Sequence, residues 1–171
     1  MVIDPKVEIP TREMLGHAIR GELQELATVI HAAGNETYRQ SIALCLLAAG
    51  YVAVDVCKRW PTDADIHEIA RNAAEAEDRV DLAESDFYDY LSGAVLGDKP
   101  LDQALGTMEA AATLPVLLTG SLVATFRPRG QKWWDYLDTI WNAASAAEHI
   151  DLWVLPALTL RAHRHESAPD V

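Results

Sequence analysis

One short phrase occurs twice in this chain, as NAAEAEDRVDL from Asn72 and as NAASAAEHIDL from Asn142. The two copies begin 70 positions apart and share Asn, three Ala, Asp and Leu in the same order. With the same shift, residues 38–82 match residues 108–152 at 11 positions without a gap. A composition rich in Ala and Leu gives about four or five matches by chance. The pattern predicts an internal duplication of a helical unit, and the alternative is coincidence between two alanine-rich helices.

The composition favours a single all-α domain. Half of the 171 residues are hydrophobic, Ala and Leu dominate, and glycine and proline are sparse. A chain of this length is long enough to bury a core of its own. We therefore predict a bundle of about six to seven helices, built from two tandem repeats related by a pseudo-two-fold axis.

The expected boundaries follow the apolar periodicity and the residues that break helices. An extended lead covers residues 1–10, the domain covers 11–160, and a frayed polar tail covers 161–171. Repeat 1 spans about 36–98 and repeat 2 about 106–160. Helices are expected over 11–33 with Thr11 as the cap, 36–59, 62–82, 85–97, 98–126 with a break at Pro115, and 133–152.

The helix expected over residues 36–59 is apolar on all sides. Over residues 42–57 only Asp55 carries a charge, and a helix without a polar face belongs in the core. Gly50 in this helix matches Gly120 in the second copy. Glycine inside a helix costs up to about 1 kcal/mol relative to alanine. A glycine in both copies therefore predicts a close approach of helices, at the point where the two apolar helices cross.

The repeated phrase is explained primarily by helix packing. Its alanines allow close helix contact, and its aspartate lies at the edge of the apolar stripe. Arg59 and Arg129 are also matched between the copies, as are Asp81 and Asp151. We therefore expect one Arg–Asp pair within each half.

The chain is strongly acidic, with a formal net charge of −12. Such a surface repels phosphate, which disfavours nucleic acid as a partner except at a local basic patch. A basic protein is the favoured kind of partner for the chain as a whole. The alternative is that the acidity only keeps the protein soluble.

The cysteines and the apolar segments predict a soluble cytoplasmic protein. Cys45 and Cys57 lie 12 residues apart in one expected helix. That spacing corresponds to roughly 18 Å of helix rise, too far for a disulfide. No signal peptide is expected at the N-terminus. The longest apolar run, residues 42–54, is too short to span a bilayer, so no membrane association is expected.

The second half of the chain concentrates tryptophan beside a basic loop. Four of the five tryptophans fall after residue 132, and residues 127–132 form the one basic cluster in mid-chain. Tryptophan and arginine dominate the binding energy of many protein interfaces. The alternative is ordinary core packing. The predicted binding residues are Arg127, Arg129, Trp133, Trp134, Trp141, His149 and Trp153.

The sequence carries no motif for nucleophilic catalysis. It has no G-x-S-x-G, no glycine-rich phosphate loop and no C-x-x-C, and its six histidines lack the spacing of a metal site. We therefore predict no catalytic residue and no cofactor.

Paired acids are the best chemical candidates, because carboxylates three residues apart on a helix share a face and can hold Mg²⁺. The candidates are Glu22, Glu25, Asp78, Asp81, Glu148 and Asp151. All-α nucleotide pyrophosphohydrolases use an E-E-x-x-E stretch on one helix and E-x-x-D on another, and Glu148-x-x-Asp151 resembles the second motif. Gly21-Glu22-x-x-Glu25 departs from the first motif, because Gly21 stands where an acid is expected.

The leading interpretation is a non-catalytic interaction protein that binds a protein partner through its Trp-rich second half. It would serve as an inhibitor or immunity-type protein, as an adaptor, or as a subunit of a homo-oligomer. One alternative is the Mg²⁺-dependent, pyrophosphohydrolase-like enzyme. The other is a small-molecule binder with a pocket between the halves, near Trp134, Trp141 and Trp153.

Overall fold

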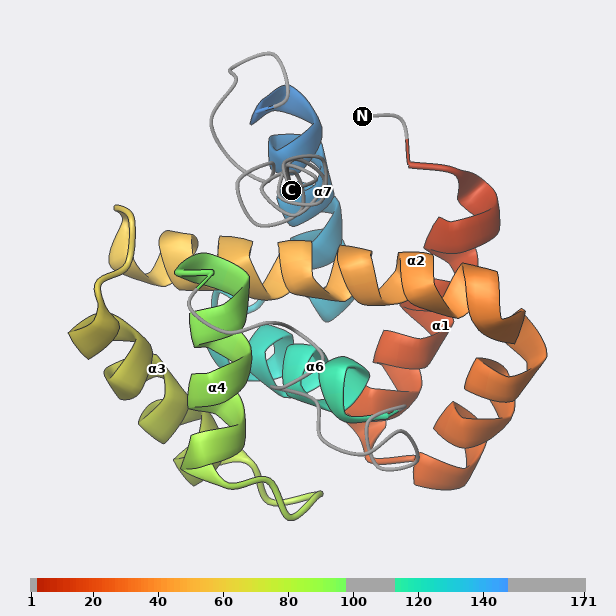
Figure 1. The fold of residues 1–171 in the computed structure, drawn as a ribbon, viewed down its shortest axis with the longest axis horizontal. Coiled ribbons are helices and arrows are strands. Elements are labelled where there is room, and N and C mark those ends of the chain that lie inside the picture. The colour runs from red at the N-terminus through yellow and green to blue at the C-terminus, as the bar shows by residue number, and fades with distance from the viewer. Residues whose placement is uncertain (1–2, 98–112, 148–171) are drawn as a thin grey trace, which may run out of the picture.

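The computed structural model describes residues 3–97 and 113–147, and within these ranges the chain forms six helices and no strand (Figure 1). The all-α fold class is therefore confirmed. The helices are α1 (Pro5–Arg20), α2 (Leu23–Cys57), α3 (Asp63–Ala76), α4 (Glu84–Val95), α6 (Leu114–Phe126) and α7 (Trp133–Ala147). The predicted polar tail, residues 161–171, lies outside the described residues.

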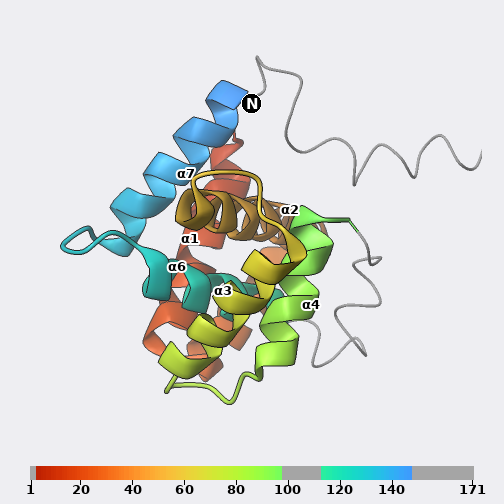
Figure 2. The same ribbon diagram turned by 90° about the vertical axis from the view of Figure 1, so that its left-hand side faces the viewer.

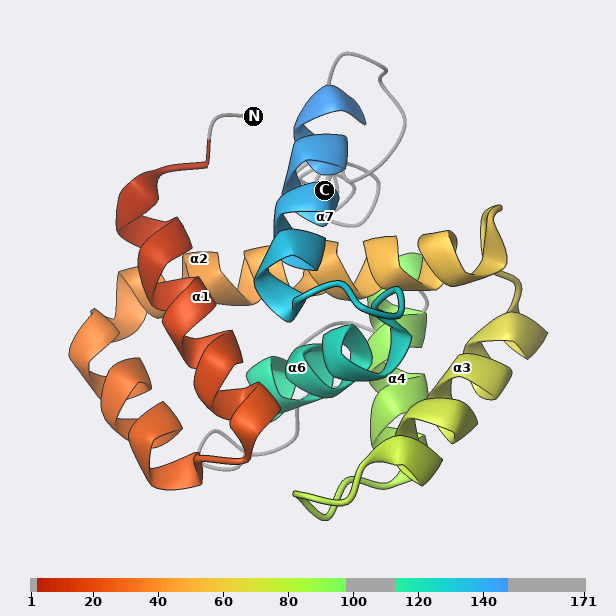
Figure 3. The same cartoon turned by 180° about the vertical axis from the view of Figure 1, so that it is seen from behind.

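The helices are arranged around α2 and α6. Helix α2 runs the length of the molecule, and the α3–α4 pair lies near its C-terminal end (Figures 1 and 2). Seen from behind, α1 and α7 cross the face of α2 opposite to α4 (Figure 3). Helix α6 contacts each of the other five described helices. It is apolar on all sides and buried over most of its length, so it is the central helix of the core.

Helix α1 begins earlier than predicted, so residues 5–10 of the expected extended lead are helical instead. Asp4 caps the helix by accepting a hydrogen bond from the Lys6 N–H (2.9 Å), and Pro5 occupies the first turn, where no backbone donor is needed. Pro10 lies inside the helix and does not end it. Thr11 is buried rather than a cap.

One glycine interrupts the stretch predicted as one helix over residues 11–33, and a second glycine marks the end of that stretch. Gly21 has a left-handed backbone (φ 69°) and ends α1, a break that the apolar periodicity did not reveal. Gly34 is also non-helical (φ 74°, ψ 163°) and kinks α2, which places a break at the predicted boundary of Gly34 and Asn35. The N-terminal part of α2 is therefore a short arm that turns back along α1 (Figure 1).

Helix α3 begins as predicted and ends before the repeated phrase is complete. Thr62 and Asp65 form a reciprocal capping box at its start. The helix ends at Ala76, and Glu77 is extended. Asp78 and Asp81 therefore lie in the loop to α4 and not on a helix, which corrects the expected i,i+3 arrangement of this pair.

The predicted pairing of Arg59 with Asp81 is wrong. The Arg59 guanidinium forms two hydrogen bonds to Asp65, at 2.7 and 2.9 Å, on the carboxylate that also takes part in the α3 cap. The pKa of Asp65 is lowered to about 2, and the hydrogen bond from Arg59 makes the largest contribution to this shift. The counterpart pair, Arg129 with Asp151, involves a residue outside the described part of the chain.

The expected close approach occurs at one of the two matched glycines. A Cβ atom at Gly120 would lie 2.9 Å from the Cβ of Ala18, so α6 and α1 touch there. At Gly50 the nearest such atom is the Ala94 carbonyl oxygen at 3.9 Å, an ordinary contact with α4. The glycines therefore do not mark a crossing of α2 with α6, as the repeat predicted.

By length and composition, α2 is the one helix among the described residues that is long and apolar enough to cross a membrane. Of its most apolar stretch, 44% is buried inside the fold. The apolar run over residues 42–54 lies inside this longer helix, so the length of the helix by itself does not exclude a span. A helix at the core of a soluble protein meets the same criterion.

Candidate functional site

The loop between α6 and α7, which we call the basic turn (residues 127–132), is the most distinctive surface feature of the described chain. It carries Arg127, Arg129 and Lys132. The Gln131 N–H donates to the Pro128 carbonyl (3.1 Å), which closes a tight turn. Gly130 sits third in that turn with φ 81°, a conformation that favours glycine. The turn therefore has a defined backbone that presents its cations in a fixed place.

A surface depression of about 450 Å³ lies over this turn. It is lined by all six residues of the basic turn, together with Ala124, Trp133 and Trp134. The structure thus brings together Arg127, Arg129, Trp133 and Trp134 from the predicted binding residues.

The two arginines of the basic turn are exposed, and neither forms an ion pair with any described residue. By contrast, the guanidiniums of Arg12, Arg59 and Arg79 each bind a carboxylate. Lys132 places its ammonium 5.0 Å from the centre of the Trp134 ring, a cation–π contact. The depression therefore combines two cations that have no described counter-charge with an aromatic wall.

The two adjacent tryptophans have different roles. Trp133 is half-buried over Gly16 of α1, where an added Cβ would lie 3.3 Å from its ring. Trp134 is 42% exposed and meets Trp133 edge to face, with ring centres 5.5 Å apart. Trp133 anchors the start of α7 on α1, and Trp134 offers its ring to solvent.

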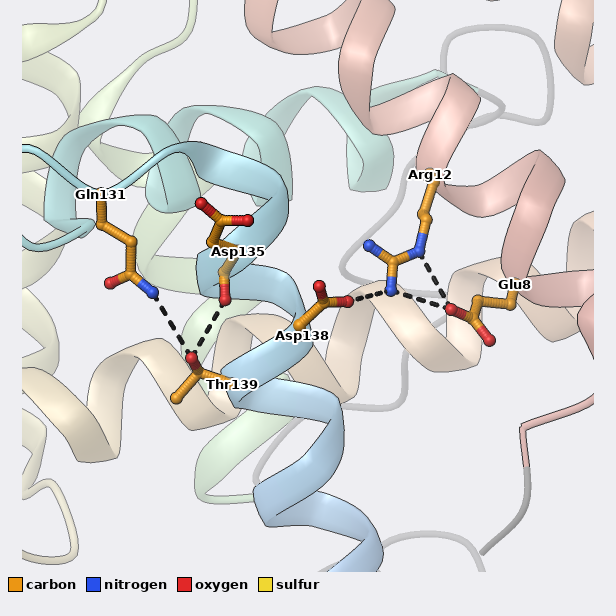
Figure 4. Close-up of polar contacts among 6 residues, drawn as sticks. All are labelled: Glu8, Arg12, Gln131, Asp135, Asp138 and Thr139. Carbon is orange, nitrogen blue, oxygen red and sulfur yellow. Dashed lines mark hydrogen bonds and ion pairs between the residues drawn. The ribbon is translucent and has the colours of Figure 1, made fainter.

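Side-chain hydrogen bonds tie the basic turn to α7 (Figure 4). The Gln131 amide donates to Thr139 Oγ1 at 3.4 Å, and Thr139 Oγ1 donates to the Asp135 carbonyl at 3.0 Å. These contacts hold the turn against the first turns of the helix. A site on such a support loses less conformational entropy when a ligand binds.

Trp141 lies in the interior, not at the surface depression. Its ring is 4% exposed, and the Arg12 guanidinium lies 4.5 Å from its centre. Arg12 also bonds Glu8 (2.8 Å) on its own helix and Asp138 on α7 (Figure 4). Trp141 is therefore packed in the core, which is the alternative stated for the tryptophans. Among the residues of α7 whose burial is described, the buried ones are Tyr136, Leu137, Ile140 and Trp141.

Removing the Arg12 guanidinium should loosen α1 from α7. We expect Arg12→Ala to lower the free energy of unfolding by about 1–2 kcal/mol, because it removes partly exposed ion pairs and a cation–π contact. Iodide quenching should show Trp141 becoming accessible, with Trp141→Phe variants used to isolate its signal. Arg71→Ala, at an exposed position on α3, is the matched control. Equal quenching before and after the Arg12 change would contradict this packing role.

The candidate magnesium ligands do not come together in the described chain. Glu22 lies at the break between α1 and α2, 2.7 Å from His17 Nδ1 and 2.8 Å from Arg20 Nε. The hydrogen bond with His17, followed by that with Arg20, lowers the pKa of Glu22. Glu25 is exposed, as are Asp78 and Asp81 in their loop. No three acidic, histidine or cysteine side chains within the described ranges are grouped as a metal site.

Four predicted site residues lie outside the described part of the chain: His149 and Trp153 from the binding set, and Glu148 and Asp151 from the magnesium set. Lys132 and Gly16, which shape the site, were not among the predicted binding residues. The position of Lys132 two residues before Trp134 was a usable signal, whereas the contact of Gly16 with Trp133 depends on tertiary packing.

Comparison with known proteins finds no family model, no curated protein and no solved structure that matches this chain significantly.

Proposed function

We propose that this chain is a non-catalytic interaction protein that binds a protein partner through the basic turn and Trp134. The observation that carries the proposal is the depression in which Arg127, Arg129 and the exposed Trp134 ring lie together. Arginine and tryptophan are the residue types most enriched among interface hot spots. The partner is another protein or a second copy of this chain, and the setting is the cytoplasm.

The support behind the site favours recognition by a preformed surface. Trp133 is seated on Gly16, Gln131 is tied to α7, and Gly130 defines the turn. When a partner binds, few side chains of this surface lose conformational freedom, apart from those of the two arginines. Preorganisation of this kind raises affinity without adding area.

The internal duplication is part of the same proposal. Helices α3 and α7 begin 70 positions apart, at Asp63 and Trp133, which agrees with the shift between the repeated phrases. Helices α2 and α6 end 69 positions apart, at Cys57 and Phe126. Among the described helices α3 lies mainly on α4 and α7 mainly on α2, and the stretch that would match α4, residues 154–165, lies outside the described residues. We propose that the second copy diverged to form the binding surface, with a pseudo-two-fold as the ancestral arrangement.

The proposal is tested by comparing two matched triple variants. The surface variant is Arg127→Ala/Arg129→Ala/Trp134→Ala. The control variant is Arg39→Ala/Arg71→Ala/Trp60→Ala, which makes the same chemical changes at exposed positions that do not line the depression. Immobilised protein would be used to retain a partner, which is then purified for calorimetry. Sedimentation equilibrium would measure self-association.

We expect the surface variant to weaken the complex, or the self-association, by tenfold or more, which corresponds to about 1.4 kcal/mol. The control variant should bind like the wild type. A strictly monomeric chain that retains no partner would contradict the proposal, as would equal loss of binding in both triple variants.

A further inference from the structure

The charge of the depression is opposite to that of the chain. The protein has a formal net charge of −12, yet the six residues of the basic turn carry three cations and no acid. Arg127 and Arg129 have no carboxylate partner among the described residues. A guanidinium presents a planar fork of donors that matches the two oxygens of a carboxylate. The site therefore selects for acidic groups, although the net charge predicts a basic partner for the chain as a whole.

The aromatic wall adds a second element of recognition. Trp134 is 42% exposed, and Lys132 lies 5.0 Å from the centre of its ring. An aromatic or aliphatic side chain packed on the remaining ring surface would remove apolar area from water beside the cations. The depression, about 450 Å³, is large enough for a few side chains. The matching ligand has carboxylates close to one apolar residue.

The surroundings of the depression favour a short ligand over a long polyanion. Asp135 is exposed on the first turn of α7, next to the basic turn in the sequence, whereas Asp138 one turn further on is paired with Arg12. A phosphate backbone that continued past the depression would meet the Asp135 carboxylate and be repelled. An acidic peptide places its carboxylates only where the arginines are. The charge pattern therefore argues for a peptide segment and against nucleic acid.

We propose that the basic turn and Trp134 bind an acidic peptide segment of a partner protein. Arg127 and Arg129 bind its carboxylates, and Trp134 packs against an apolar side chain between them. This inference rests on the proposed function and specifies the chemistry of the partner.

The test uses a short fluorescent peptide in which glutamates and aspartates surround one phenylalanine, titrated with the full chain and followed by fluorescence anisotropy. A second peptide has Gln and Asn in place of the acids. A third probe is a labelled single-stranded oligonucleotide of the same net charge. The protein variants are Arg127→Ala/Arg129→Ala, Trp134→Ala and the control pair Arg39→Ala/Arg71→Ala.

We expect the acidic peptide to bind at least tenfold more tightly than its neutral counterpart. Arg127→Ala/Arg129→Ala should weaken it by tenfold or more, and Trp134→Ala should weaken it several-fold. The control pair should leave its affinity unchanged. Added salt should weaken binding, because exposed charges are screened.

Four results would overturn the inference: no binding of the acidic peptide, equal binding of the neutral peptide, tighter binding of the oligonucleotide, or equal loss of affinity in the control pair. The partner measurement with the triple variants separates this failure from failure of the proposed function. Suppose that the complex is weakened by the three substitutions of the surface variant while the acidic peptide does not bind. The proposed interaction site is then supported, and only the proposal that it binds an acidic peptide is contradicted.

Discussion

Gly120→Ala is expected to destabilise the protein, although alanine is the better helix former. The added Cβ would lie 2.9 Å from the Cβ of Ala18 and 3.4 Å from the Ile19 backbone nitrogen, so α1 and α6 must separate. Overpacking of this kind costs about 1–3 kcal/mol. The gain in helix propensity is at most about 1 kcal/mol. Urea denaturation followed by circular dichroism should therefore show a lower free energy of unfolding.

Gly50→Ala is the matched control, because the duplication pairs these two glycines. The nearest atom to a Cβ at Gly50, outside its own helix, is 3.9 Å away, so alanine fits without displacement. We expect no loss of stability and a gain of up to about 1 kcal/mol. The predicted difference in sign comes from packing alone. Equal effects at the two glycines would show that α1 and α6 are not in close contact.

Arg79→Ala is expected to cost about 2–3 kcal/mol at neutral pH. The Arg79 guanidinium bonds Glu77 at 2.5 and 2.9 Å and also donates to the Ile19 carbonyl at the end of α1. The Glu77 side chain is 3% exposed, so removing its cation leaves a covered carboxylate unpaired. Breaking a buried pair costs about 3–5 kcal/mol, and we expect less here because the site lies near the surface. Thermal and urea unfolding would measure this loss.

The pH dependence distinguishes this mechanism from a simple loss of packing. Burial raises the pKa of Glu77, but hydrogen bonds from Arg79 and Ser121, together with the charge of Arg79, more than offset this, so its pKa is lowered in the folded protein. The stabilisation it gives is present above the ordinary glutamate pKa and is lost as the pH falls through the lowered value. In Arg79→Ala only the Ser121 hydrogen bond opposes the effect of burial, so the variant should lose less stability on acidification than the wild type.

A second substitution serves as the control for this pH effect. Glu77→Gln in the Arg79→Ala background removes the uncompensated charge and should recover part of the lost stability at neutral pH. A defect that is independent of pH and is not relieved by Glu77→Gln would contradict the role of the buried carboxylate.

Local signals in the sequence were sufficient for several boundaries of the fold. Thr62 caps α3, Trp133 opens α7, Gly34 kinks α2, and Pro115 lies in the first turn of α6. Each of these boundaries follows from the local backbone preferences of the residues there and does not require contacts with the rest of the fold.

Tertiary contacts decided what the sequence did not reveal. Helix α3 ends at Ala76, and the segment after it is fixed by Arg79, which reaches the carbonyl of Ile19 at a separation of 60 residues. Trp141 is part of the hydrophobic core, and Arg12, from the far end of the chain, packs on its ring. Contacts between distant parts of the chain leave no trace in the apolar periodicity of a single helix, so they could not be predicted from it.

Most of the candidate site was predictable because its parts are adjacent in the chain. Arg127, Arg129, Trp133 and Trp134 fall within eight consecutive residues, so a single loop and helix start bring them together. The separation of roles between the tryptophans was not predictable. It depends on Gly16, which seats Trp133 on α1 and leaves Trp134 facing solvent.

The most direct test of the binding surface is an NMR titration that follows the indole N–H signals of the five tryptophans. The chain would be titrated with the acidic peptide, and each indole would be assigned from single Trp→Phe variants. We predict that the Trp134 signal shifts most and that the Trp60 and Trp141 signals stay in place. A shift centred on Trp60, or a Trp134 signal that does not move while peptide binds, would contradict the claim that the basic turn and Trp134 form the binding site.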